Sequence, residues 1–232
     1  MFSKKKSVCL LTLLLAVTCL FVYQFKNGST FNGNKIAFAA SIQANNLNVE
    51  YIKVKIPSGY SEHWRDIITL QERSDTYDNN GKLANRILVS EKGKRVISIG
   101  NDNGKMEAYS WILPDDIANE NKTLLSKSLL ENVKNELKQS KWIDKGKKKL
   151  VDGREVRVIE SSFEGLTEVV YVDATDFPIK REFFKNENGQ LKLLEERTEE
   201  YKKISSQSGE IFEYNGPEVK EIPAPVGENG KG

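Results

Sequence analysis

Short turn sequences built on Asn-Gly and Asp-Gly recur along this chain and divide it into short segments. Four of them are Asp78–Gly81, Asn101–Gly104, Asp152–Gly153 and Asn186–Gly189. Asn-Gly and Asp-Gly supply the positive φ that tight hairpin turns require, so each of these turns predicts a hairpin. Strands that are connected to their neighbours by such turns form an antiparallel meander.

The segments between the turns alternate apolar and polar residues, which is the period of a strand with one buried face. The alternation occurs at Leu83–Val89, Arg154–Val158, Glu168–Val172 and Ile179–Phe184. We therefore expect an α+β fold that is mainly antiparallel β.

One segment has the three- and four-residue spacing of an amphipathic helix instead. Its apolar residues are Leu125, Leu129, Leu130, Val133 and Leu137. The spacing predicts one helix, roughly over 123–140, that packs its apolar face onto the sheet. Ser128 and Glu131 have the spacing of a capping box, but a start further upstream fits the apolar stripe better. Asp115 and Asp116 suit a helix start, because acids favour the positive end of the helix dipole.

The first forty residues have the features of an export signal. Lys4–Lys6 precede an apolar run from Val8 to Phe25, and a small-residue site follows at Ala37–Ala40. The rest of the chain is therefore expected to work outside the cytoplasm, either secreted or tethered to the membrane at the cell envelope. The general style of this leader is bacterial.

Three outcomes are open for the leader. A peptidase that cuts after Ala39 or Ala40 would release the rest of the chain. The apolar run is also long enough to stay as a membrane anchor, with the basic residues held inside. In the third outcome Cys19 carries a lipid, but Thr18 stands where such a leader normally has Gly or Ala. We favour cleavage over retention, and either of them over lipidation.

Cysteine usage and charge limit what the exported part can do. Both cysteines, Cys9 and Cys19, lie in the leader, so the remainder can form no disulfide and no thiolate metal site. Five of the 35 Lys and Arg residues lie in residues 1–40, which hold no acid, so the remainder has 30 basic and 33 acidic residues. A mildly acidic domain does not indicate nucleic acid as a partner. The basic run Lys145–Lys149 is interpreted as a solvated hairpin.

Composition divides the chain into four parts. They are a signal peptide or anchor at 1–40, a spacer at 41–48, one domain at 49–216 and a flexible tail at 217–232.

No residue set predicts catalysis or a metal site. His63 is the single histidine, and no Ser-centred elbow or cysteine nucleophile accompanies it. The Asn- and Asp-rich turns lack the acidic positions of an EF-hand loop. We therefore expect a protein that is not an enzyme and uses no metal or cofactor.

Large apolar residues are the remaining candidates for a binding site. In the binding interpretation they line an apolar cavity that a curved sheet encloses, with the helix as its lid, and this cavity holds one apolar ligand. The candidates are Trp64, Trp111, Leu130, Val133, Leu137 and Phe184. The competing interpretation is that such residues simply form the hydrophobic core.

Three passages resemble a known group of proteins. They are Tyr77–Ser90, Leu150–Val156 and Val170–Arg181, the last followed by Gly189 and another strand. In shape and spacing, the chain from Trp64 to Lys203 resembles the periplasmic lipoprotein-carrier superfamily, which includes LolA-like carriers and RseB-like envelope sensors.

The resemblance implies a strongly curved antiparallel sheet, an unclosed half-barrel, with the helix packed into its mouth as a lid. It also implies a lipid, an acyl chain or a membrane protein as the partner, and it carries over no catalytic residue. The possible anchor favours a tethered sensor over a diffusing carrier. The alternative function is a cell-envelope interaction or structural module with a solid core and no small-molecule ligand.

Overall fold

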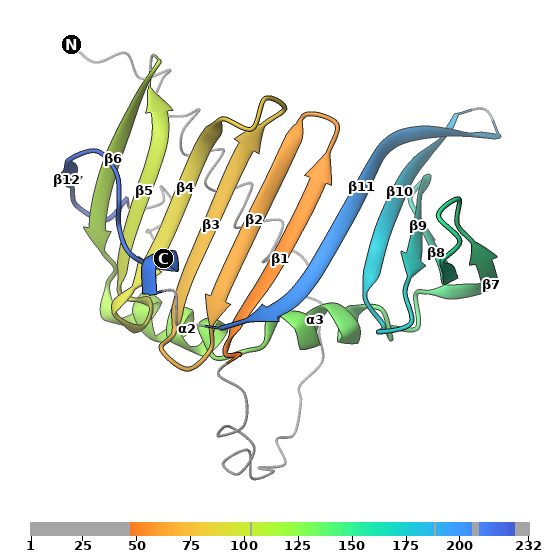
Figure 1. The fold of residues 1–232 in the computed structure, drawn as a ribbon, viewed down its shortest axis with the longest axis horizontal. Coiled ribbons are helices and arrows are strands. Elements are labelled where there is room, and N and C mark those ends of the chain that lie inside the picture. Colours follow the sequence, from red (N-terminus) through yellow and green to blue (C-terminus); the bar gives the residue numbers. More distant parts are fainter. Residues whose placement is uncertain (1–46, 103, 188, 206–208, 226–232) are drawn as a thin grey trace, which may run out of the picture. The chain divides into compact units, whose positions relative to one another are not determined.

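The computed structural model describes residues 47–102, 104–187, 189–205 and 209–225, and its strands form one sheet (Figure 1). The strands are β1 Val49–Ile56, β2 Gly59–Asp66, β3 Gln71–Asp78, β4 Leu83–Ser90, β5 Arg95–Asp102, β6 Lys105–Ile112, β7 Ile143–Lys149, β8 Glu155–Phe163, β9 Leu166–Val172, β10 Pro178–Glu187, β11 Gln190–Ile204 and β12 Val219–Glu221.

The order of the strands shows an unclosed sheet. It runs β12-β6-β5-β4-β3-β2-β1-β11-β10-β9-β8-β7, so β12 and β7 are its edges. Every neighbouring pair is antiparallel except β12 and β6, which are parallel. The prediction of a mainly antiparallel fold is confirmed.

The predicted hairpin turns are present because their glycines adopt the positive φ that the turns need. Gly81 has φ +76° and Gly153 has φ +87°. In the first of these turns the Gly81 amide donates to the Asp78 carbonyl over 3.0 Å. The four segments that the alternation marked as strands fall in β4, β8, β9 and β10, except that Arg154 precedes β8.

Two helices, α2 (Asp115–Leu125) and α3 (Leu129–Glu136), connect β6 to β7. The prediction of one continuous helix over 123–140 is therefore wrong. The chain breaks at Ser126–Ser128 because the Ser128 side chain caps a new helix, its Oγ accepting from the Glu131 amide over 3.0 Å. The helix start at the two aspartates is confirmed, since α2 begins at Asp115.

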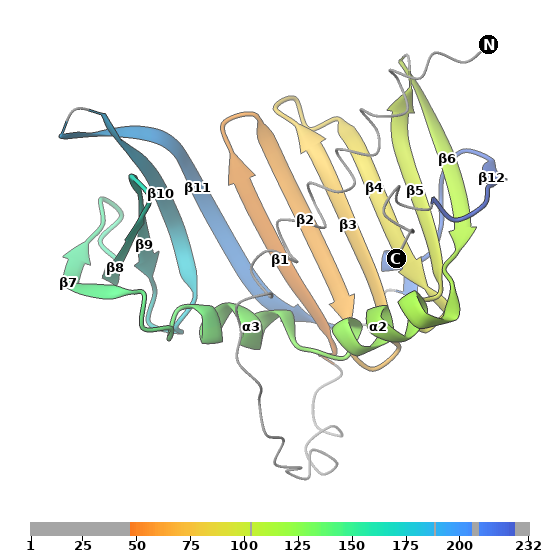
Figure 2. The same cartoon turned by 180° about the vertical axis from the view of Figure 1, so that it is seen from behind.

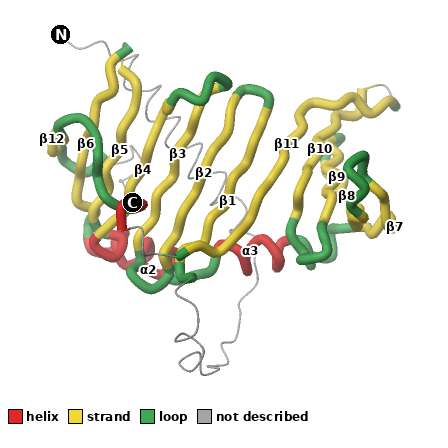
Figure 3. The backbone as a smooth tube through the Cα atoms, viewed as in Figure 1, coloured by secondary structure: helices red, strands yellow, loops and turns green. Residues whose placement is uncertain are grey.

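Both helices lie on one face of the sheet, at one end of its strands. Figures 2 and 3 show them at the same end of the strands as the turn between β2 and β3, and at the opposite end from the turn between β10 and β11. We call this end of the strands the helix end. Among the described residues, no helix combines the length and the hydropathy needed to cross a membrane.

Two short 3-10 helices complete the description, η1 at Glu91–Gly93 and η2 at Gly209–Ile211. Part of the segment that the sequence assigned to a flexible tail is ordered as β12. Its residues Val219–Glu221 pair with Ala108–Ser110 of β6.

The long strand β11 joins the two halves of the sheet. Thr198 to Ile204 pair with β1, whereas Gln190 to Thr198 pair with β10. Only Thr198 takes part in both ladders. The half of the sheet with β1–β6 therefore joins the C-terminal part of β11, and the half with β7–β10 joins its N-terminal part.

Register defines two faces of the sheet, because residues paired across a ladder share a face and successive residues alternate. Glu50 pairs with Arg65, and both side chains contact the helix segment. We call their side the helix face and the opposite side the outer face.

The edge strand β7 is protected against pairing with another sheet. All of its residues are exposed, four of them are lysines, and its register with β8 shifts between Asp144 and Lys147. Lysines and bulges are common means of blocking edge-to-edge association. The interpretation of Lys145–Lys149 as a solvated hairpin agrees with this exposure.

Candidate functional site

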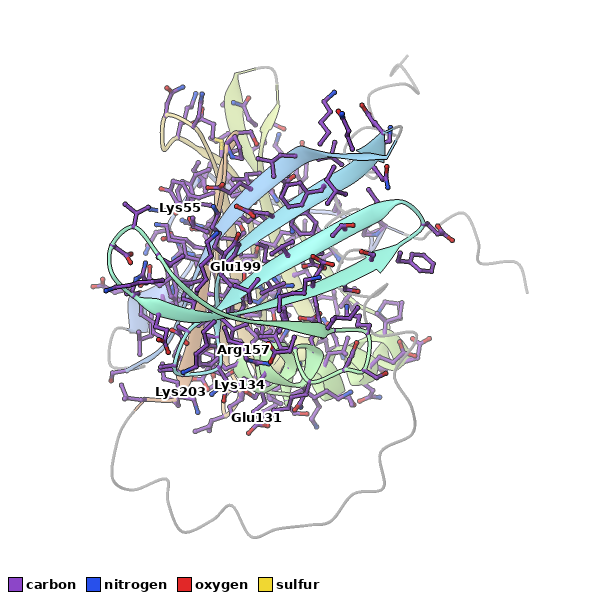
Figure 4. The ribbon with its side chains drawn as sticks, turned by 90° about the vertical axis from the view of Figure 1, so that its right-hand side faces the viewer. Lys55, Glu131, Lys134, Arg157, Glu199 and Lys203 are labelled. Carbon is purple, nitrogen blue, oxygen red and sulfur yellow. The ribbon has the colours of Figure 1, made fainter. Side chains whose placement is uncertain are left out.

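A buried carboxylate on the sheet fixes the start of α3. Glu50 in β1 is 1% exposed, and its oxygens accept from the Ser128 hydroxyl over 2.7 Å and the Leu129 amide over 2.6 Å. The ammonium of Lys203, a residue labelled in Figure 4, lies 4.0 Å from the same carboxylate. A negative charge at this position satisfies free amides and complements the positive end of the helix dipole.

An arginine beside Glu50 fixes the end of α2. Arg65 donates to the carbonyls of Leu124, in the last turn of α2, and Lys127, in the link to α3, over 3.2 and 3.1 Å. Arg65 also pairs with Glu72, and Glu72 lies 3.2 Å from His63 Nε2. Burial would raise the pKa of Glu72, but His63 and Arg65 together lower it to about 2.

A second cluster fixes the far end of α3. The Arg181 guanidinium in β10 lies 3.3 Å from Glu136 at the end of α3, 2.6 Å from Glu168 and 3.1 Å from Glu199. Burial alone would lower the pKa of Arg181, but the three carboxylates raise it above its ordinary value. Lys134 adds another contact, donating to the Thr175 carbonyl over 2.7 Å.

Apolar packing fills the space beneath α3. Leu137, Ile159, Val170 and Val172 form one buried cluster, and Trp142 packs against it. Two cavities of about 140 and 310 Å³ occur elsewhere, the first at the β1–β2 turn and the second between η1 and α2. Neither of these two cavities includes any of the six residues that the sequence suggested for ligand binding.

The three helical candidates lie together. Leu130 in α3 and Leu137 at its end are buried, and Val133 between them is half-buried. Residues three and four apart share one side of a helix. Leu137 belongs to the cluster beneath α3, and Leu130 is 7% exposed, so both pack in the interior.

The three candidates on the sheet do not meet at one surface. Trp111 lies on the helix face, in the register row that runs through Val96 and Val89 to Glu72. Trp64 pairs with Tyr51 and Arg73 on the outer face.

Phe184 also lies on the outer face, where it pairs with Thr167 and Leu193.

The predictions for the leader fall outside the described residues. They concern the leader run from Val8 to Phe25, the alternative lipidation at Cys19 and the cleavage sites at Ala39 and Ala40. His63 lies within β2, and its side chain contacts Glu72. Within 47–102, 104–187, 189–205 and 209–225, no cluster of three or more His, Cys, Asp or Glu residues could hold a metal ion.

Large apolar side chains gather at two neighbouring hairpins on the other end of the strands. Phe163 and Leu166 flank the β8–β9 turn, and three leucines follow the β10–β11 turn. Their exposed fractions lie between 49% and 72%: Phe163, Leu166, Leu191, Leu193 and Leu194. We call these five residues the hairpin patch. Exposed apolar groups of this kind mark interaction surfaces.

Backbone pairing brings the two hairpins together. Leu166 pairs with Lys185 of β10, and the Asn186 amide donates to the Gly165 carbonyl over 2.9 Å. The β8–β9 turn is tight because Glu164 and Gly165 both have positive φ, 50° and 78°. The hairpin patch is therefore one continuous part of the sheet.

Of the residues predicted to bind a ligand, only Phe184 lies next to the hairpin patch, and none belongs to it. The available signal was the position of the apolar residues beside turns, at Phe163 and Leu166 around Gly165 and at Leu191 just after Gly189. Turn-flanking residues of a hairpin lie where the sheet ends, so elements that cross the strands elsewhere leave them uncovered.

Comparisons with known proteins give distant structural similarity. No protein-family model and no curated protein sequence matches the chain. An uncharacterized conserved protein from Thermus thermophilus has 13% identity and a TM-score of 0.44, with 76% of this chain and 93% of that chain covered.

Two crystal forms of PNGF-II have TM-scores of 0.31 and 0.30 at 13% and 12% identity, each covering 76% of this chain. The chain spans about a third of the length of PNGF-II, 32% and 31% in the two forms. Similarity of this degree carries no argument about function, which therefore depends on the geometry of the chain itself.

Proposed function

We propose that this chain is an extracytoplasmic, non-enzymatic protein that binds an apolar or lipidated partner through the hairpin patch. The observation that carries the proposal is the exposure of five large apolar side chains on two hairpins that pair with each other. The export leader and the resemblance to LolA-like carriers and RseB-like sensors support it. In this proposal the sheet is a half-barrel and the helix pair is its lid.

In this proposal the partner binds outside the lid, because several contacts hold the helices on the sheet. Glu50, Arg65 and Arg181 hold the junction and the far end of α3, and apolar side chains fill the space beneath α3. Entry of an acyl chain there would require these contacts to break. Binding at the hairpin patch leaves them intact.

A second candidate is an envelope interaction module with a solid core and no lipid ligand. The filled packing of Leu137 against Ile159 and Val170 favours it. Only binding of an apolar or lipidated partner requires an acyl chain on that partner. The interaction module would bind a partner without one.

Binding of a dye-labelled acylated peptide, compared with the same peptide without its acyl chain, tests the proposal. We expect the full chain to bind only the acylated form. Leu191→Ser with Leu193→Ser should weaken binding about tenfold or more, because two leucines lose their apolar contact. Ile68→Ser with Ile117→Ser is the matched control, since these residues are 56% and 47% exposed but lie elsewhere.

Equal affinity of the patch variant and the native chain for the acylated peptide would contradict the proposal. Equal affinity of the native chain for both peptides would instead support the interaction module.

A further inference from the structure

The hairpin patch exposes apolar side chains on both faces of the same end of the sheet. Phe163 pairs with Leu166, and this row continues through Lys185 on the helix face. Leu191 and Leu193 belong to the opposite set, since Leu193 pairs with Phe184 on the outer face. The patch is therefore a two-sided wedge rather than a flat area.

A two-sided wedge limits what can cover it. A protein docked on one face would bury Phe163 and Leu166 and leave Leu191 and Leu193 in water, or the reverse. An apolar medium that surrounds the hairpin ends covers both sets at once, and the interfacial layer of a lipid bilayer is such a medium.

The charges near the patch fit the same environment. The hairpin ends hold two acids and two lysines, Glu164, Glu187, Lys185 and Lys192, so their formal charge sums to zero. Lys185 and Lys192 lie 3.3 and 3.6 Å from Glu187. Both lysines share the register row of Leu166, where their stems can follow an apolar surface while the ammonium groups reach the headgroups.

We propose that the hairpin patch inserts into the interfacial layer of a lipid bilayer, with the ends of both hairpins surrounded by lipid. This inference rests on the proposed function, because it names the apolar partner of the same surface. Since the hairpin ends are neutral, insertion depends on apolar burial rather than on attraction to anionic lipid.

Environment-sensitive fluorescent labels at single cysteines test the inference in the full chain. Cys9→Ser and Cys19→Ser remove the native thiols. Phe163→Cys and Leu191→Cys then place one label on each face of the patch, and Ile68→Cys places a control label at the β2–β3 turn. Each label senses its own surroundings, so binding of the leader to the same vesicle does not affect the comparison.

With phosphatidylcholine vesicles, we expect the emission of the labels at 163 and 191 to shift to the blue. Lipids that carry a shallow nitroxide should quench both labels, and added salt should leave the signals unchanged. The control label should show neither effect. A blue shift at only one of the two positions would overturn the inference, because only one face of the patch would then contact the lipid.

The absence of a shift at both positions would also overturn it. The acylated-peptide measurement then separates the two proposals. If the peptide still binds through the patch, only membrane insertion fails, and if it does not bind, the proposed function fails with it.

Discussion

The helix end of the sheet differs from the opposite end, which carries the hairpin patch and is called the hairpin end. The two ends differ in which side chains are buried and which are exposed. At the helix end, Glu50 is buried and the Arg181 side chain is only 12% exposed, and each contacts several partners. At the hairpin end, leucines and a phenylalanine are exposed beside tight turns. Figure 4 shows Lys134 and Lys203 near the helices and Lys55 toward the other end.

This contrast separates the residues that stabilise the fold from the residues that are available to bind a partner. Removing one member of a buried ionic contact leaves its partner uncompensated and destabilises the fold, so these contacts favour one arrangement of the helices. Exposed apolar side chains contribute little to the fold but gain free energy when a partner covers them. Substitutions at the helix end should therefore change stability, and substitutions at the hairpin patch should change binding.

The largest effect is expected for Arg181→Met. It leaves Glu136, Glu168 and Glu199 near one another without their shared cation, which should cost about 3–5 kcal/mol of unfolding free energy. Urea denaturation measures this cost. The matched control is Arg197→Met, whose pair with Glu195 is about one third exposed and should cost less than about 1 kcal/mol. Equal losses in the two variants would remove the contrast.

The second largest effect is expected from acid, which should destabilise the helix end. The pKa of Glu72 is lowered to about 2, so the pair with Arg65 and His63 contributes stability above the pKa of an unfolded Glu, near 4.5. This contribution, about 3 kcal/mol, is lost as the pH falls from about 4.5 to 2. Urea titrations across this range measure the free energy of unfolding, which should fall less steeply with decreasing pH for Glu72→Gln than for the native chain. Glu164→Gln at the hairpin end is the control, and an unchanged slope for Glu72→Gln would contradict the assignment.

Part of this architecture could be predicted from the sequence, because it depends on neighbours along the chain. The turn at Gly81 and the alternation at Leu83–Val89 specify a hairpin locally, and both are present. The helix break was missed because the apolar stripe continues through it from Leu125 to Leu137. The residues that hold the break, Glu50 and Arg65, come from strands about 60 to 80 residues earlier.

The candidate site was less predictable than the fold. Aromatic and aliphatic residues look alike in sequence whether they are buried or exposed, so Trp111 and Phe184 were grouped although they lie on opposite faces. Exposure of Leu191 and Leu193 depends on which strand ends the helices cover, and that placement is set by contacts distant in sequence.

A smaller loss is expected at the start of α3. Glu50→Gln keeps the size of the side chain but removes the negative charge of the carboxylate that accepts from Ser128 and Leu129. This should lower the free energy of unfolding by about 1.5–3 kcal/mol. Ser128→Ala removes only the capping hydroxyl and should cost about 1 kcal/mol. Thermal or urea unfolding of the two variants checks the order. A larger loss for Ser128→Ala would show that the carboxylate is not the main anchor.

The smallest change in stability is expected at the hairpin patch. Leu191→Ser with Leu193→Ser should alter the unfolding free energy by less than about 0.5 kcal/mol per residue, because both side chains are about half exposed. The same variant should lose affinity for the acylated peptide. A large loss of stability would show that these leucines belong to the core, which would remove the distinction between the two ends.

Amide hydrogen exchange with and without the acylated peptide tests the central claim most directly, because it reports both ends in one measurement. The account predicts slower exchange on binding in Phe163–Thr167 and Phe184–Leu194. It predicts unchanged exchange in α2 and α3. Faster or slower exchange in Asp115–Glu136, with no change at the two hairpins, would show that the partner enters beneath the helices and would contradict the account.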